Sequence, residues 1–195
     1  MDGLIFVNSA NIDFKRLNRL FVYLNDWDYG DDNDFFKLVT TKDAHELDEN
    51  EGTRLMSIEP VHADLDADPA NAWQGSSLAD IEKHILGLGG TLYLLLDDKG
   101  ALDHTVIIGE RRWDDETEGL TDDFDRVRCP WDCAYSMWAN LDIANMNFDE
   151  FINDEKGKDE DGWYEYTEDL PADISEESQR RRAEKLAKLE REGKA

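Results

Sequence analysis

The segment CPWDCAYSMWANLDIANMNFDEFI, residues 129–152, combines both cysteines, two of the six tryptophans and a dense mixture of apolar and amide side chains. Pro130 suits the first turn of a helix, because the N–H that proline lacks would have no partner there. Cys133, Met137 and Leu141 then recur at four-residue spacing, which places them on one helical face. The segment therefore predicts a helix over residues 131–141 that packs on the rest of the fold.

Short apolar runs elsewhere in the chain predict the strands of a sheet. Residues 92–96 (LYLLL) lie between turn signals, which is typical of a central strand covered on both faces. Residues 4–7 (LIFV) have the same character and precede apolar residues at helical spacing. We expect strands near residues 4–8, 35–41, 91–96, 104–110 and 124–129, and helices near 12–25, 77–88 and 131–141. The sequence thus predicts an α/β fold: one domain with a four- to five-stranded mixed sheet flanked by helices.

Polar segments follow and interrupt this core. Residues 113–123 are rich in acids and predict a loop, whereas Trp163, Tyr164 and Tyr166 predict an edge strand or an arm held against the body. Residues 175–195 contain seven Lys or Arg and five Glu, with Ser175 as a potential N-cap. We therefore expect an acidic α/β domain over residues 1–168 and a mixed-charge, solvated helical tail over residues 169–195.

The segment NLDIANMNFDE, residues 140–150, resembles the pattern N-L-x-[IV]-A-N-M-x-F-[DE]-[DE]. That pattern is similar to the hallmark of a family of small bacterial and fungal domains of unknown function. The resemblance extends over about residues 91–166 and implies no catalytic residue. Physically, Asn140 and Asn145 suit a helix-ending turn, because Asn binds local backbone groups and tolerates positive φ. Met146 and Phe148 are then expected to fill the core beneath that turn.

The net charge of −26 limits the classes of partner. Such a surface repels nucleic acid and anionic membranes and favours a basic protein partner, so we expect no direct nucleic-acid binding. The first residues, MDGLIFVNS, lack a basic signal-peptide region, and no run approaches the length of a membrane span. With two cysteines four residues apart, a reducing, cytoplasmic location is expected. The sequence leaves the oligomeric state open.

Candidate catalytic residues are few. His104, with Asp97 nearby in the sequence, could form a set with Cys129 or Cys133, in which the carboxylate orients the imidazole and the imidazole activates the thiol. The simpler interpretation is that the thiols are buried and that the histidine has a structural role. Neither cysteine belongs to a zinc-binding spacing, and no glycine-rich phosphate loop precedes a helix, so no metal or cofactor is expected.

Three hypotheses of function follow. The first is a non-catalytic accessory or interaction protein that presents an acidic face to a basic partner. The second is an enzyme with a pocket at the carboxyl ends of the strands, near Asp97, His104 and Cys129, where open α/β sheets bind ligands. The third is a mimic of nucleic acid, in which carboxylates stand in for phosphates. The lack of a complete catalytic set favours the first.

Overall fold

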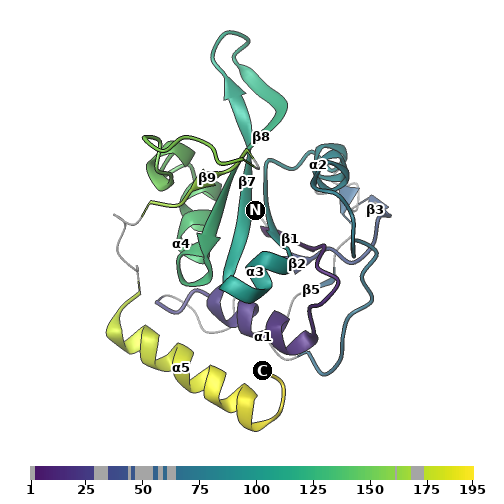
Figure 1. The fold of residues 1–195 in the computed structure, drawn as a ribbon, viewed down its shortest axis with the longest axis vertical. Coiled ribbons are helices and arrows are strands. Elements are labelled where there is room, and N and C mark those ends of the chain that lie inside the picture. The colour runs from purple at the N-terminus through teal and green to yellow at the C-terminus, as the bar shows by residue number, and fades with distance from the viewer. Residues whose placement is uncertain are drawn as a thin grey trace.

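The computed structural model describes residues 3–28, 35–43, 45–46, 55–56, 59–60, 65–160, 162–167 and 174–195. Within them, seven strands form one mixed sheet in the order β5-β2-β1-β6-β7-β8-β9. Helices cover both faces, and Figure 1 shows α2 and α4 on opposite sides of the sheet. The expected α/β fold with a mixed sheet is confirmed, but the expected size of four to five strands is wrong.

Parallel strands form the middle of the sheet. β1 (Gly3–Val7) lies between β2 (Phe36–Leu38) and β6 (Leu92–Leu96) and is parallel to both. β7 (Thr105–Asp114) and β8 (Gly119–Pro130) continue the sheet in antiparallel fashion, and β9 (Tyr164–Glu165) ends it, parallel to β8. The other edge is β5 (Glu59–Pro60), while β3 (His45–Glu46) and β4 (Leu55–Met56) form a separate pair.

Side chains alternate between two apolar layers because successive strand residues point to opposite faces. On one face, α1 (Phe14–Tyr23) and α4 (Trp131–Asp142) contribute to the same core as Ile5, Leu94 and Ile108. On the other face, α2 (Leu78–Gly87) covers the core that contains Phe6 and Tyr93. The helices predicted near 12–25, 77–88 and 131–141 are thus confirmed, with bounds that differ by up to two residues.

Two segments differ from their predicted conformation. Residues 113–123, expected as a loop, mostly continue β7 and β8, which form a long hairpin that projects beyond the body of the molecule (Figure 1). Pairing between neighbouring strands overrides the low strand propensity of its Asp and Glu residues. The turn signal that follows residues 92–96 instead begins the short helix α3 (Asp98–Asp103), which Asp97 caps by accepting a hydrogen bond from the N–H of Gly100.

The C-terminal helix α5 (Glu176–Arg191) packs on the body instead of extending into solvent. Leu189 is fully buried in a small cluster with Val22 and Trp27. Arg19 on α1 pairs with Glu190 at 2.7 Å, and Ser178 donates a hydrogen bond to the carbonyl of Trp27. The sequence alone predicts this contact poorly, because few apolar residues recur at helical spacing in α5. The expected boundary at residues 168–169 lies outside the described residues.

No helix in the described parts of the chain combines the length and the apolar character that a membrane crossing requires.

Candidate functional site

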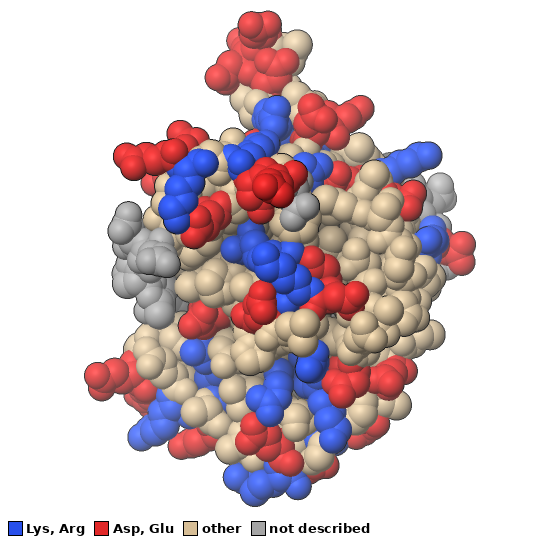
Figure 2. All heavy atoms as spheres, viewed as in Figure 1, with Lys and Arg blue, Asp and Glu red and all other residues tan. Residues whose placement is uncertain are grey.

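The β7–β8 hairpin projects from the body of the molecule (Figure 1). Its turn is stabilised locally, because the carboxylate of Asp114 accepts hydrogen bonds from the backbone N–H of Glu116 and the hydroxyl of Thr117, both at 2.9 Å. Glu118 adopts positive φ, at 50°, and returns the chain. Figure 2 shows acidic side chains gathered on this projecting tip, where Asp114, Asp115, Glu116 and Glu118 lie.

Two large apolar side chains lie just below the acidic tip. Trp113 and Leu120 are partners across the hairpin and are 56% and 44% exposed. Single exposed apolar residues are ordinary, but a tryptophan and a leucine side by side on a projecting element form an apolar patch. Tryptophan in particular is enriched among the residues that contribute most to binding. The hairpin therefore carries a surface of the kind that docks to other molecules.

A cleft of about 550 Å³ opens beside this hairpin. That volume lies within the range of ligand pockets, about 300–1,000 Å³. One wall comes from β7 and β8, and the other comes from the segment that follows α4. The lining residues include Glu110, Trp113, Leu120, Asp125, Met146 and Phe148.

The wall that follows α4 is the segment that resembles a family hallmark. Asn140 donates to the carbonyl of Ser136 at 2.9 Å, and the side chain of Asn145 donates to that of Asn140 at 2.7 Å. Asn140 thus binds a local backbone group as predicted, whereas the side chain of Asn145 binds another side chain and Ala144, at 52°, takes the positive φ. Phe148 begins the short 3₁₀ helix η1 (Phe148–Phe151). Met146 and Phe148 pack against the core but remain partly exposed, so they also shape the cleft.

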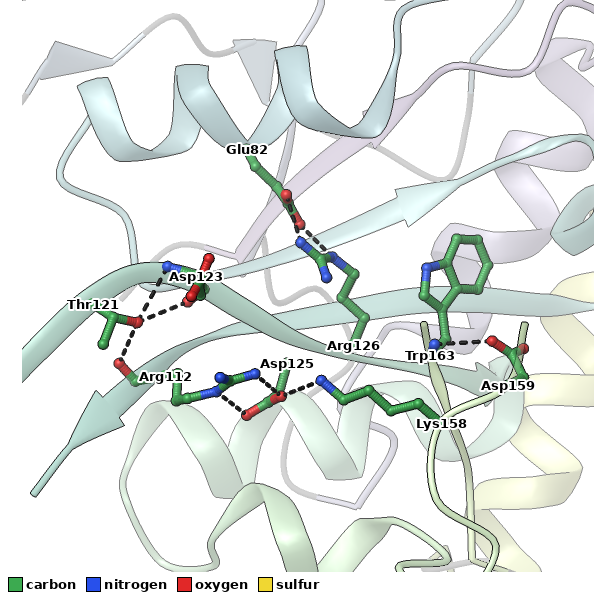
Figure 3. A network of polar contacts seen from close by, with 9 residues as sticks. All are labelled: Glu82, Arg112, Thr121, Asp123, Asp125, Arg126, Lys158, Asp159 and Trp163. Carbon is green, nitrogen blue, oxygen red and sulfur yellow. Dashed lines mark hydrogen bonds and ion pairs between the residues drawn. The ribbon is translucent and has the colours of Figure 1, made fainter. Parts of the chain in front are cut away.

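Charged groups line the β-sheet side of the cleft. Glu110 and Asp125 are direct partners across β7 and β8, so two carboxylates face one another. Arg112 neutralises Asp125 with two hydrogen bonds of 2.9 and 3.2 Å, and Lys158 adds a third at 3.0 Å (Figure 3). Figure 3 also shows Arg126, from the same strand, directed to the opposite face of the sheet, where it binds Glu82. The ion pair between Arg126 and Glu82 therefore lies on the face of the sheet opposite the cleft.

The two carboxylates titrate in opposite directions. Burial, together with the nearby charge of Asp125, raises the pKa of Glu110 to about 7. Burial also opposes ionisation of Asp125, but hydrogen bonds from Arg112 and Lys158 outweigh it and leave the pKa of that carboxyl below its usual value. The carboxyl group of Glu110 makes no hydrogen bond or ion pair with the residues that the structure describes. In the described part of the chain, Glu110 thus has no cation partner, whereas the neighbouring Asp125 has two.

A family model described as a domain of unknown function (DUF6924) matches residues 27–167. The chain belongs to this family. The match begins well before residue 91, where the resemblance in the sequence was expected to start, and it includes every residue that lines the cleft. No curated protein and no solved structure matches the chain.

In this DUF6924 chain, Asp97 and His104, which the sequence suggested as catalytic partners, contact other residues instead of one another. Asp97 forms a two-point ion pair with Arg128, at 2.6 and 2.9 Å, instead of orienting His104. His104 ends α3 in a left-handed conformation and stacks on Trp131, with 4.8 Å between ring centroids. Within the described residues, no hydrogen bond joins His104 to Asp97 or to either cysteine.

The two thiols lack the features of nucleophiles. Cys129 is fully buried, and burial raises the pKa of its thiol well above the usual value. Burial likewise raises the pKa of Cys133, and Asp132 adds to the effect. A reactive cysteine needs a lowered pKa, and the pKa of both thiols is raised. Both cysteines are free rather than joined in a disulfide.

A smaller cavity does lie at the carboxyl ends of β1 and β2, where open α/β sheets bind ligands. Its volume is about 260 Å³, and its lining includes Ser9, Asp68 and Asn71 but none of the predicted catalytic residues. The carboxylate of Asp68 accepts a hydrogen bond from the N–H of Phe14 at 2.7 Å, so an acid already occupies the start of α1. This position therefore disfavours the phosphate that such helix ends usually bind.

Sequence reasoning missed Glu110 and the hairpin. A signal for Glu110 exists, because it follows Val106 and Ile108 at two-residue spacing and so occupies a core-facing strand position. In the described parts of the chain, no group of three or more His, Cys, Asp or Glu residues is arranged to hold a metal ion.

Proposed function

We propose that this protein is a non-catalytic interaction protein that binds a basic segment of a partner protein in the cleft beside the β7–β8 hairpin. The observation that supports the proposal is the combination of an open cleft of about 550 Å³ with exposed Trp113 and Leu120 at its edge. Apolar contacts of this kind supply most of the binding free energy of protein interfaces, whereas rim charges steer the approach of the partner.

Charge complementarity indicates a basic partner. The residues that line the cleft include five acids, and the lining arginines are Arg111 and Arg112. Both arginines are already engaged, Arg111 with the carbonyl of Thr121 at 2.8 Å and Arg112 with Asp125. The acids of the hairpin tip lie immediately beyond. A cationic segment therefore meets an excess of negative charge along its whole path into the cleft.

The other hypotheses have less support. On the face shown in Figure 2, acidic and basic side chains are interspersed below the hairpin, which favours a local acidic feature over extended phosphate-like rows. An enzyme with a pocket near Asp97, His104 and Cys129 would need these groups to act together, and Asp97 is engaged by Arg128. We also propose a cytoplasmic location, because both cysteines are unpaired.

Binding to an array of short peptides of varied charge would test the proposal. We expect a sequence-restricted set of basic peptides to bind, and to weaken when salt rises from about 0.1 M to about 1 M, which shortens the Debye length from about 10 Å to about 3 Å. Substituting serine for both Trp113 and Leu120 should reduce binding about tenfold or more. Leu102→Ser is the matched control, because Leu102 is 68% exposed on α3 and does not line the cleft.

If the double variant binds the same peptides as the wild type, the hairpin is not the docking surface. If all basic peptides bind equally, whatever their sequence, only the overall charge of the protein is responsible.

A further inference from the structure

Glu110 is a partly buried carboxylate of the cleft that has no counterion among the described residues. It lies on β7, between Leu92 of β6 and Asp125 of β8, and is therefore set in the middle of the sheet rather than at its edge. Burying a carboxylate is costly unless a cation or hydrogen-bond donors accompany it. Among the described residues none bonds to the Glu110 carboxyl group, although Asp125 opposite has both Arg112 and Lys158. The site thus retains capacity for one further cation.

Lys158 shows how the cleft holds a cation. Its ammonium lies 3.0 Å from a carboxylate oxygen of Asp125 and 4.9 Å from the centre of the Tyr164 ring. A carboxylate and an aromatic face together are a favourable environment for a cation. Glu110 lines a cleft that also contains the aromatic side chains of Trp113 and Phe148. Within the described part of the chain, Lys158 thus supplies a cation to Asp125, and no residue supplies one to Glu110.

The chemistry of the lining favours a guanidinium over an ammonium. The planar group of arginine can donate two parallel hydrogen bonds to one carboxylate, and it stacks on aromatic rings. It is also more weakly hydrated than the ammonium of lysine, so its entry into a half-buried cleft costs less.

We propose that Glu110 is the residue that selects an arginine side chain of the basic partner, with the guanidinium paired to its carboxylate and stacked against the aromatic residues of the cleft. This inference rests on the proposed function, and it names the side chain that the cleft recognises. The arginine is that of a different protein. The chain's own basic run includes Arg181 and Arg182, which stack on Trp27 and Tyr23 of the same molecule.

Labelled Gly/Ser peptides that carry arginine, lysine or citrulline at every third position would test this selection by fluorescence anisotropy. We expect the arginine peptide to bind best and the neutral citrulline peptide not to bind. Glu110→Gln should weaken the arginine peptide about tenfold to a hundredfold, as expected for a lost hydrogen-bonded charge pair. Glu177→Gln, which removes the same charge from the exposed first turn of α5, outside the lining of the cleft, should change binding less than about twofold.

The pH dependence provides a readout that a general loss of charge would not produce. Wild-type affinity for the arginine peptide should fall about tenfold from pH 8 to pH 6, because the pKa of Glu110 lies near 7 and protonation removes the carboxylate. The Gln variant should lack this component. It retains every other charged or titratable group that the structure places at the cleft: Arg111, Arg112, Asp115, Asp125, Asp149, Asp154, Lys158 and Tyr164.

The outcomes separate the two proposals. Equal binding of the arginine peptide to the wild type and to Glu110→Gln would overturn the role of Glu110, even if the hairpin variants confirm the docking surface. Equal binding of arginine and lysine peptides would overturn the selection of arginine. Self-association of the wild type, abolished by Glu110→Gln, would place the basic segment on a second copy and overturn the choice of a foreign partner.

Discussion

Replacing Glu110 with glutamine should stabilise the protein at pH 8 and have little effect near pH 5. The carboxyl is held in a half-buried position opposite Asp125, so its charged form is disfavoured in the folded state. In the unfolded chain the same group is solvated and ionises at its ordinary pKa of 4.5. Glutamine has nearly the same shape and never ionises, and it therefore removes this cost of charge burial.

The direction of the pH effect follows from proton binding. The folded state has the higher pKa, so it binds more protons than the unfolded state between pH 4.5 and about 7. The free energy of unfolding of the wild type should fall through this window and level off above it. One pKa unit is worth about 1.36 kcal/mol, and the shift from 4.5 to about 7 corresponds to about 3 kcal/mol at most. Partial solvation of the site reduces the expected gain to about 1–3 kcal/mol.

Urea unfolding at a series of pH values from about 5 to about 8 would measure the effect. The difference between Glu110→Gln and the wild type isolates Glu110, because the general repulsion among the many acids affects both proteins alike. Glu116→Gln controls for the loss of one negative charge and should show no such window. A difference that is constant from pH 5 to pH 8 would refute the reasoning, since Glu110 would then not change its protonation in that range.

Three further perturbations test the fold. Gly109→Ala should destabilise the protein by about 2–4 kcal/mol in urea unfolding, because the added Cβ would lie 2.1 Å from the buried Tyr93 ring. The control Gly87→Ala should be neutral or slightly stabilising, because no atom lies within 4 Å of the added Cβ. Similar losses of stability at both sites would contradict this packing. Leu189→Ala should cost about 2–4 kcal/mol and speed hydrogen exchange in α5, and unchanged exchange would show that the helix does not depend on this contact. Cys129 should resist alkylation by iodoacetamide at pH 8 until the protein unfolds, whereas rapid reaction in the folded state would contradict its burial and its raised pKa.

The helices and the central strands could be predicted because their signals are local. The cap of α2 illustrates this: Ser77 accepts a hydrogen bond from the N–H of Asp80, three residues on, as the capping pattern indicates. The apolar run of β6 likewise identified a strand covered on both faces. Such patterns extend over a few residues and depend little on the rest of the chain.

The hairpin and its cleft could not be predicted in this way. Acidic residues have low strand propensity, so the residues around Trp113 and Leu120 resembled a loop. Their strands form because β7 and β8 pair along almost their whole length, with one irregularity between Arg111 and Trp113. The position of Glu110 opposite Asp125 depends on this register, and a shift of one residue would move the two to opposite faces.

The sequence by itself determined the strongly acidic charge, the apolar segments that build both cores, and the turn that ends α4, where Asn side chains form hydrogen bonds. Tertiary structure alone decided which charged groups meet, because electrostatic interactions depend on distances in space between residues far apart in the chain. Asp97 thus meets Arg128 instead of His104, and Lys158 reaches Asp125 from a segment 33 positions away. Glu110 lies opposite Asp125 in the sheet and has no cation partner among the residues that the structure describes.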